Sequence, residues 1–180
     1  MVKWIEPRTW VSGETVTYAA MNTLSDQLQY LKERDRVHCY NTDEQDIKND
    51  RWDRLNWSDD KYDNNDMHFS RRRTALVQIR RDGIYMIILK VNFANAATGQ
   101  RRTMLRRNSG GEPTGGQSLG IYAARLATTG VTTVHAQRLA RLDRGDNICA
   151  FARQSSGGTI DVNGGKETSF LQVLQVASIP

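Results

Sequence analysis

The chain has 180 residues, of which 38% are hydrophobic and 25% are charged, and its formal net charge is +5 at pH 7. This length and apolar content suffice for one sizeable core with a short extension, but hardly for two full domains. No run of about 18 consecutive apolar residues occurs, which argues against a membrane-spanning helix and a membrane partner. The amino terminus lacks the apolar stretch of a secretory signal, so we expect synthesis and retention in the cytosol unless a larger assembly carries the protein out.

The distribution of charge argues against a simple nucleic-acid-binding protein. Residues 43–66 carry nine acidic side chains, and basic clusters follow at residues 71–73 and 101–107. Arginine binds carboxylates through its planar fork, so we expect these opposite clusters to pair, within a subunit or between subunits. No recognition helix or aromatic platform accompanies the arginines, and we therefore expect no nucleic-acid partner.

The first 16 residues contain two tryptophans but no regular hydrophobic period. Large aromatic side chains on an irregular segment need a surface that buries them, and Trp is a frequent anchor of interfaces. We interpret Trp4, Ile5 and Trp10 as a docking arm that inserts into a partner protein. The alternative is that the arm folds back onto its own subunit.

A short helix is predicted after this arm. Thr15 or Thr17 can cap a helix that begins near Tyr18. Spacings of three, four and three residues then separate four apolar positions in the pattern of a coiled coil, Met21, Leu24, Leu28 and Leu31. A helix with so short a stripe is not stable alone, and we expect it either to pack on a partner or to be held in register by the domain that follows, which would supply three such helices side by side if it is a trimer. Residues 32–36 should follow as a solvated charged neck, so that an arm and helix (1–36) precede a head (37–180).

The most apolar stretch of the chain lies at residues 79–91 and predicts a core strand. Tyr85, Ile87 and Leu89 alternate with Met86 and Ile88, so both faces of the strand are apolar where it begins. A strand that is apolar on both faces contacts a second sheet or a neighbouring subunit. We therefore expect Tyr85, Ile87 and Leu89 to be core or trimer residues.

Further strands are predicted on both sides of this one. A first strand is expected at residues 37–40, and residues 50–57 should form an irregular strand that packs Trp52, Leu55 and Trp57 inward. The last strand, residues 168–176, is again apolar on both faces. Phe170 and Leu174 share one face with Val176, opposite Leu171 and Val173, and we assign Phe170 and Leu174 to the core or to a trimer contact. Residues 101–107, 119–124 and 131–142 are also strand candidates. A further strand is expected at residues 147–151, where Cys149 should share a face with Phe151.

Three short motifs invite a functional interpretation. The Asp- and Asn-rich segment 57–66 lacks the specific spacing of a calcium loop and is typical of turns, with calcium binding at residues 59–66 as the open alternative. Residues 111–118 resemble a phosphate-binding loop, but Gln117 stands in place of its lysine and no helix follows. Arg144-Gly145-Asp146 reads as a turn rather than as an adhesion motif.

Catalytic and metal-binding constellations are also missing from the sequence. The three histidines are isolated, and no nucleophile elbow or metal-binding spacing accompanies them. We expect no enzymatic activity, no cofactor and no metal. Cys39 and Cys149 are too few for a disulfide framework or a zinc site, so we expect small buried side chains, with a disulfide between the two as the open alternative.

Eight to ten short strands, with no helix after residue 36, predict a mainly β protein built as a two-sheet sandwich. Four segments in order, 82–85 (DGIY), 101–108 (RRTMLRRN), 139–146 (LARLDRGD) and 169–171 (SFL), resemble the globular heads of the tumour necrosis factor-like and complement-q-like proteins. This resemblance implies a jelly roll that forms a closed homotrimer. Residues 10–22 and 62–68 look more narrowly like the versions of such heads in tailed-phage structural proteins.

The resemblance implies a non-enzymatic virion protein, assembled in the host cytoplasm. The arm would attach a homotrimeric head to capsid or tail proteins, and the head would serve as a capsid decoration protein or as a tail fibre or spike. A fibre or spike would bind a glycan or protein of the host surface. The alternative is a soluble ligand- or glycan-binding module with no virion.

Overall fold

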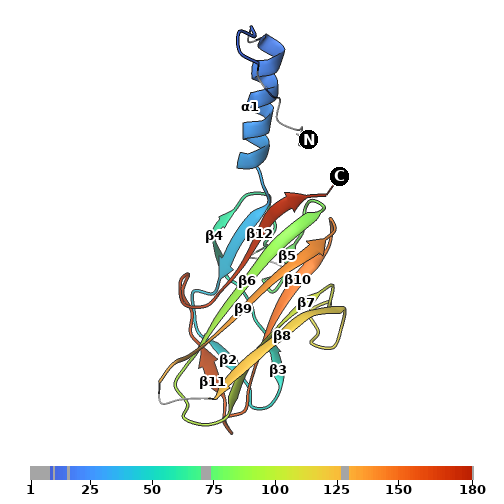
Figure 1. Ribbon diagram of the computed structural model, residues 1–180. Coiled ribbons are helices and arrows are strands. Elements are labelled where there is room, and N and C mark those ends of the chain that lie inside the picture. Colours follow the sequence, from blue (N-terminus) through green and yellow to red (C-terminus); the bar gives the residue numbers. More distant parts are fainter. Residues whose placement is uncertain (1–8, 10, 16, 70–73, 127–129, 180) are drawn as a thin grey trace. The chain divides into compact units, whose positions relative to one another are not determined.

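The computed structural model of the chain describes residues 9, 11–15, 17–69, 74–126 and 130–179. These residues form one α-helix and twelve β-strands, and the chain divides into two compact units, residues 1–34 and 35–180 (Figure 1). No helix in the described ranges is long and apolar enough to cross a bilayer.

The helix of the first unit is α1 (Tyr18–Lys32), which begins where the sequence predicts. Thr17 has an extended backbone, and its side-chain oxygen accepts a hydrogen bond from the amide of Ala20 at 3.2 Å. This cap satisfies one of the amides that the first helical turn leaves free. Lys32 in the last turn complements the negative end of the helix dipole.

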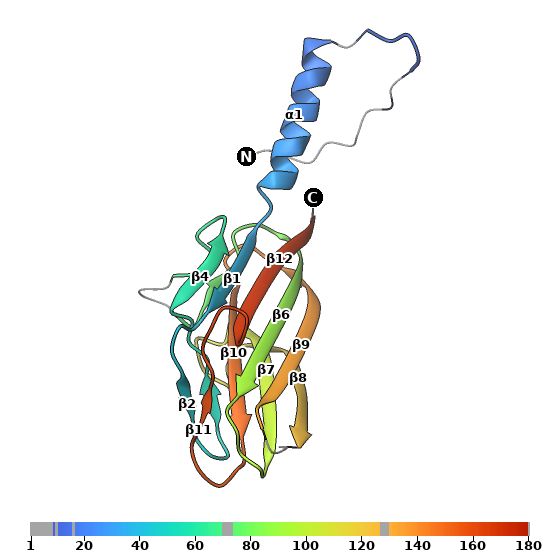
Figure 2. The ribbon, with the colours of Figure 1, turned by 90° about the vertical axis from the view of Figure 1, so that its left-hand side faces the viewer.

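The second unit is a sandwich of two sheets. The seven-stranded sheet has the order β2 (Gln45–Ile47), β11 (Ile160–Val162), β6 (Gly83–Phe93), β12 (Phe170–Ser178), β1 (Arg36–Tyr40) and β4 (Asp59–Asp63), and β9 (Thr132–Leu142) pairs with the other edge of β6. The five-stranded sheet has the order β3 (Trp52–Arg54), β10 (Asn147–Gln154), β7 (Gln100–Arg107) and β8 (Gln117–Leu126), with β5 (Val77–Gln78) on β10. The two layers lie face to face, and strands distant in sequence lie side by side (Figures 1 and 2).

This architecture confirms the predicted two-sheet jelly roll with a short helix before it. The expected count of eight to ten strands was too low. The sequence did not reveal four of the strands. Strands β2, β5 and β11 have only two or three residues each, too few for an alternating pattern to be recognised, and the five residues of β4 lie in the polar segment 57–66, where no apolar alternation marks a strand.

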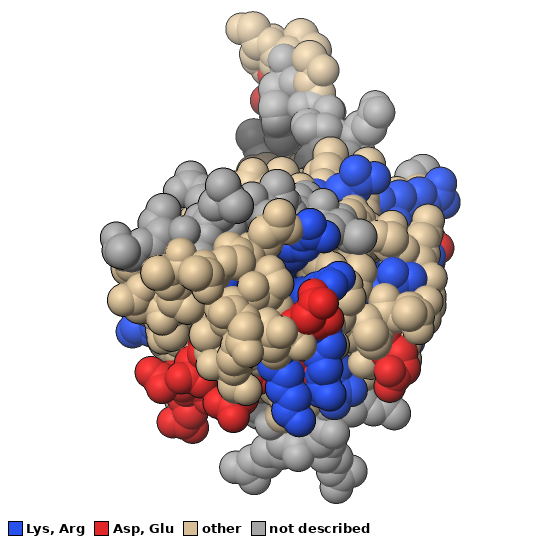
Figure 3. Space-filling view, turned by 90° about the horizontal axis from the view of Figure 1, so that it is seen from below, with Lys and Arg blue, Asp and Glu red and all other residues tan. Residues whose placement is uncertain are grey.

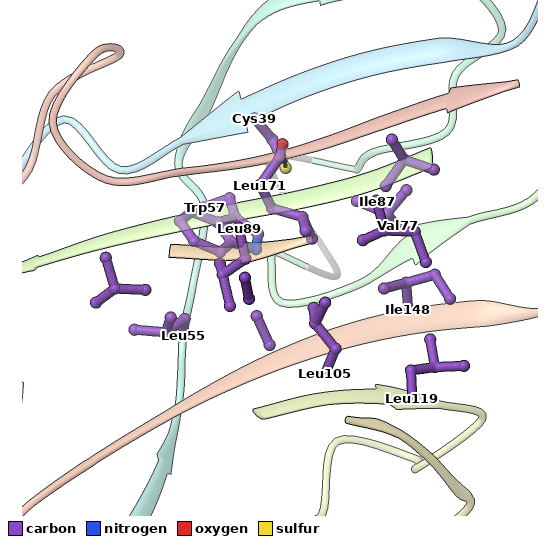
Figure 4. Close-up of a cluster of buried hydrophobic side chains, with 14 of the residues drawn as sticks. Cys39, Leu55, Trp57, Val77, Ile87, Leu89, Leu105, Leu119, Ile148 and Leu171 are labelled. Carbon is purple, nitrogen blue, oxygen red and sulfur yellow. Dashed lines mark hydrogen bonds between the residues drawn. The ribbon is translucent and has the colours of Figure 1, made fainter. Parts of the chain in front are cut away.

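The core lies between the sheets and is centred on β6. Ile87 and Leu89 are completely buried and point toward the five-stranded sheet, where Leu105 and Ile148 lie (Figure 4). Tyr85 is completely buried in the same cluster. Burial of one such aliphatic side chain contributes about 1.5–3 kcal/mol. The alternate residues of β6 lie on the opposite face and are only partly buried in the single chain.

The segment of residues 50–57 differs from its prediction. Only Trp52–Arg54 pairs as a strand, and Trp52 does not point into the main core. Its side chain packs on a second, smaller cluster formed by Met104, Cys149 and Phe151. Leu55 and Trp57 follow outside the strand, and both are buried in the main core as expected.

The predicted solvated neck is wrong at Asp35, whose side chain is completely buried. The carboxylate accepts hydrogen bonds from the Tyr85 hydroxyl at 2.9 Å and the Asn65 amide at 2.6 Å, and Arg81 Nε lies 3.5 Å away. The charge alternation of residues 32–36 hid this role, because the partners are 30 to 50 residues away in sequence. Asp35 therefore fixes the start of the second unit.

Both cysteines are free and buried, as expected, and no disulfide joins them. Cys39 lies on β1 in the seven-stranded sheet, and its thiol donates to the Leu171 carbonyl at 3.4 Å. Cys149 lies on β10 in the other sheet and shares a face with Phe151, as predicted. Burial raises the pKa of both thiols above the usual value.

Candidate functional site

The outward face of the seven-stranded sheet carries a row of apolar side chains. The strand register places Met86 opposite Leu139 of β9 on one side and opposite Leu174 of β12 on the other. Ile88 follows Met86 on the same face. We call Met86, Ile88, Leu139 and Leu174 the apolar face; Leu139 is 55% exposed, and the other three are half-buried.

Aromatic rings continue this face toward β1 and β4. The His38 ring stacks on Phe170 with ring centres 4.6 Å apart, and it lies 5.7 Å from the ring of Tyr62. Lys90 Nζ lies 6.0 Å from the centre of the Phe170 ring, and Lys166 provides a carbonyl 2.9 Å from His38 Nε2. These contacts order a mixed aromatic and cationic margin beside the apolar face.

Strand β9 adds a free edge to the same region. It pairs with β6 over eleven residues, and no other strand of the seven-stranded sheet pairs with it in the described part of the chain. A long edge strand presents unpaired backbone groups and invites contact with another chain. An apolar face beside such an edge is typical of a subunit interface.

The helical stripe is exposed within its own unit. Met21, Leu24 and Leu28 are 52%, 43% and 60% exposed. Apolar side chains at this spacing, left uncovered by their own unit, need another surface to bury them. The side chain of Leu31 and the arm residues Trp4, Ile5 and Trp10 lie outside the described residues.

The predicted strand residues therefore divide between two faces. Tyr85, Ile87 and Leu89 lie in the core between the sheets, whereas Phe170 and Leu174 lie on the outward face. In β12 the inward residues are Leu171, Val173 and Gln175. The sequence could not assign the faces of this strand, because both of them are apolar.

The short motifs are occupied by internal contacts. The Asp146 carboxylate is nearly buried and accepts from Arg107 Nε at 2.7 Å and from the Asn108 amide at 2.7 Å, so it is not available as an adhesion ligand. In the loop of residues 108–116, the Arg106 guanidinium donates to the carbonyls of Gly115 and Gly116. That loop is therefore held by a side chain of the protein itself.

The histidines do not assemble a catalytic group. His38 and His135 lie on the outward face, and the buried His68 ring lies between the Asp60 carboxylate at 3.2 Å and the Thr74 carbonyl at 3.3 Å. Within the described residues, no group of three or more His, Cys, Asp or Glu side chains is placed to hold a metal ion. In segment 59–66, Asp63 accepts from the backbone amides of Met67 and His68.

The expected pairing of the acidic and basic clusters does not occur within the described chain. Arg107 pairs with Asp143 and Asp146, and neither carboxylate belongs to residues 43–66. Arg102 and Arg106 donate to neutral groups. The sign of each cluster can be read from the sequence, but the faces on which its members lie cannot. Residues 71–73 lie outside the described ranges.

Comparison with known proteins places this geometry in a known fold. No protein-family model matches the sequence, and no curated protein matches it. The chain is similar to the structure of Eiger TNF from S. frugiperda, with 14% identity, a TM-score of 0.62, and coverage of 82% of this chain and 96% of that one. The chain has the tumour necrosis factor-like jelly-roll fold.

Two further structures agree with this fold. Murine APRIL has 13% identity and a TM-score of 0.59, over 79% of this chain and 99% of its own. The globular domain of zebrafish complement 1qA has 11% identity and a TM-score of 0.56, over 81% and 100%. These similarities confirm the jelly roll inferred from four short segments. None of the three is a phage protein, and the narrower resemblance to phage heads stays a prediction.

Proposed function

We propose that the protein is a non-enzymatic structural and recognition module that works as a homotrimer. The observation that carries this proposal is the apolar face of Met86, Ile88, Leu139 and Leu174 beside the free edge of β9. Three copies can each place a β9 edge against the apolar face of the next copy and so close a ring. The contact buries side chains that a single chain leaves in water.

The helical stripe supports the same assembly. Met21, Leu24 and Leu28 are exposed in the single chain. Three parallel copies of α1 would bury this stripe at a common seam, which a helix of 15 residues needs because it is marginal alone. The head and the helix would thus both favour a trimer.

We further propose that the trimer belongs to a phage particle that is assembled in the host cytoplasm. The resemblance of residues 10–22 and 62–68 to tailed-phage heads supports this assignment. The arm with Trp4, Ile5 and Trp10 would dock into capsid or tail proteins, and the head would act as a decoration protein or as a tail fibre or spike. The second candidate is a soluble module that binds a glycan or protein on a host surface.

The trimer is tested by placing a charge on its proposed interface. Leu139→Glu adds a carboxylate at an exposed position of the apolar face, so we expect the fold to persist while the trimer dissociates at micromolar concentration. Ser118→Glu adds the same charge at an exposed position of β8 in the other sheet and should leave the trimer intact. Sedimentation velocity and far-ultraviolet circular dichroism measure the two properties. Equal masses for the wild type and Leu139→Glu would contradict the interface.

The particle assignment is tested separately by the copy number of this chain relative to the major capsid protein in purified particles. Quantitative mass spectrometry gives this ratio. A ratio near one indicates a decoration protein, and a few trimers per particle indicate a fibre or spike. Absence from particles would refute the virion proposal and leave the soluble module.

A further inference from the structure

A small polar hollow lies on the outward face of the five-stranded sheet. Its volume is about 70 Å³, and its lining comes from the turn before β3 and from β7 and β10: Asp50, Gln100, Arg102, Arg153, Gln154 and Ser155. The strand register places Arg102 directly opposite Arg153. Like charges in this arrangement destabilise a sheet, so an anion between them would relieve a repulsion that the fold imposes.

The hollow has an excess of positive charge. Arg153 Nη2 lies 2.5 Å from the Asp50 carboxylate, whereas the Arg102 guanidinium donates to the neutral Gln100 side chain. Two guanidinium groups thus face one carboxylate. Arginine binds a carboxylate with two parallel hydrogen bonds, which makes Arg102 suited to an acidic ligand group.

The walls of the hollow are held in place by bonds to the backbone. The Asp50 amide donates to the Gln154 carbonyl at 2.7 Å, and the Gln100 amide donates to Ser155 Oγ at 3.0 Å. The Gln154 side chain is almost fully buried and donates to the carbonyls of Ile47 and Gly158. A site with such walls needs little reorganisation to accept a ligand.

The same face extends the basic surface beyond the hollow. Arg106 lies four residues after Arg102 on β7, roughly 13 Å away at the rise of a strand, and Arg54 lies on β3. Among the described residues, Asp50 is the one carboxylate that pairs with any of Arg54, Arg102, Arg106 and Arg153. Figure 3 shows basic side chains at several places on the lower end, with an acidic group among those near the middle.

An apolar surface adjoins this charge. Trp52 is the other cross-strand neighbour of Arg153, and its partly buried ring rests on Met104, Cys149 and Phe151. Sugar rings have apolar C–H faces that pack on aromatic side chains, while their hydroxyls need both donors and acceptors. The hollow offers donors in Arg102 and Arg153 and an acceptor in Asp50.

We propose that this hollow binds a carboxylate-bearing sugar of an acidic polysaccharide. The sugar carboxylate lies on Arg102, a neighbouring hydroxyl donates to Asp50, and Arg54 and Arg106 attract further acidic units along the chain. The inference deepens the proposed function, on which it rests, by naming a ligand class for the head. Asp50 disfavours DNA, because its charge repels phosphate and the sugar–phosphate backbone of DNA has no free hydroxyl along the chain to donate to it.

The first experiment measures binding of the full chain to polygalacturonate by calorimetry at about 0.15 M salt, where distant charges are screened. Dextran serves as the neutral polysaccharide, dextran sulfate as a polyanion without carboxylates, and duplex DNA as the phosphate polyanion. We expect polygalacturonate to bind more tightly than dextran sulfate or DNA, and dextran not to bind. No binding of polygalacturonate, or tighter binding of DNA, would overturn the proposal.

Two variants locate the site. Arg102→Gln should weaken polygalacturonate binding by about tenfold or more. Arg144→Gln makes the same change of charge in the exposed turn between β9 and β10, at the opposite end of β10 from Arg153, and should leave the affinity within about twofold. If Arg102→Gln and Arg144→Gln lost affinity for polygalacturonate equally, binding would depend only on net charge, and the proposed site would be refuted.

Asp50→Asn separates a sugar site from a general basic surface. Asp50 has a left-handed backbone with φ of 57°, which Asn adopts readily, so the turn should persist. Loss of the acceptor charge should weaken polygalacturonate binding several-fold and strengthen DNA binding. Stronger binding of both polygalacturonate and DNA by Asp50→Asn would refute the proposal.

Light scattering on the same samples measures the oligomeric state and so distinguishes the sugar site from the trimer. A trimer that binds no polygalacturonate refutes only the sugar site, and a monomer that binds polygalacturonate refutes only the trimer.

Discussion

Replacing Asp35 by alanine should lower the free energy of unfolding by about 3 kcal/mol. The side chain is completely buried, and its carboxylate accepts from Tyr85 and Asn65 with Arg81 close by. A hydrogen bond to a charged group contributes about 1.5–3 kcal/mol. One such bond is partly replaceable, because the Tyr85 hydroxyl also lies 2.8 Å from the Arg81 carbonyl, so the expected loss is below the sum of two bonds.

Urea unfolding followed by tryptophan fluorescence measures this change at one fixed protein concentration, because self-association would make stability concentration-dependent. Asp35→Asn keeps an acceptor oxygen, so its free energy of unfolding should fall by about half as much as that of Asp35→Ala. Glu112→Ala removes an exposed carboxylate and serves as the control, with an expected change within about 0.5 kcal/mol. A loss below about 1 kcal/mol for Asp35→Ala would refute the account of Asp35 as the residue that fixes the start of the second unit.

Three further predictions follow from burial and backbone geometry. Burial and the adjacent Asp35 charge raise the pKa of Tyr85 above its usual value of 10.0, so the contribution of Tyr85 to stability is present below about pH 10 and is lost as the pH rises further. Between about pH 9.5 and pH 11.5, the free energy of unfolding of Tyr85→Phe should therefore fall less steeply with pH than that of the wild type; equal slopes in this window would contradict the shift. Gly99→Ala should lower the free energy of unfolding, measured by thermal unfolding, by about 2–4 kcal/mol, because φ is +79° and the new Cβ would lie 2.0 Å from the Ser155 carbonyl oxygen. Gly157→Ala is the control: φ is +98° but the space around it is open, so its free energy of unfolding should fall by only about 1–2 kcal/mol. Ellman's reagent should label Cys39 and Cys149 only after denaturation without reductant, since both thiols are buried and free; a denatured chain that stays unlabelled would contain a disulfide.

The strand β6 shows what the sequence could predict. Its alternation of Tyr85, Ile87 and Leu89 with Met86 and Ile88 identifies the strand and shows which residues share a face, because side chains on a strand repeat every two residues, but the structure was needed to show which face is the inner one. The sequence likewise predicts that a helix begins near Tyr18, and the structure selects Thr17 over Thr15 as its cap. Strong local patterns of this kind were sufficient to predict a two-sheet sandwich.

The interaction surfaces depend on information that local sequence lacks. Leu139 reads as an ordinary strand residue, and only its register beside Met86 and Leu174 shows a continuous apolar face. The opposition of Arg102 and Arg153 also comes from pairing between strands 51 residues apart. The sequence located the basic cluster at residues 101–107, but not the hollow in which Arg102 and Arg153 meet Asp50.

The central claim is tested most directly by the mass of the full chain in solution. Size-exclusion chromatography with multi-angle light scattering should give three times the 20.4 kDa of one chain at about micromolar concentration. A mass that stays at three chains on dilution would support the trimer with the apolar face at its interface. A mass of one chain across the accessible concentrations would contradict it.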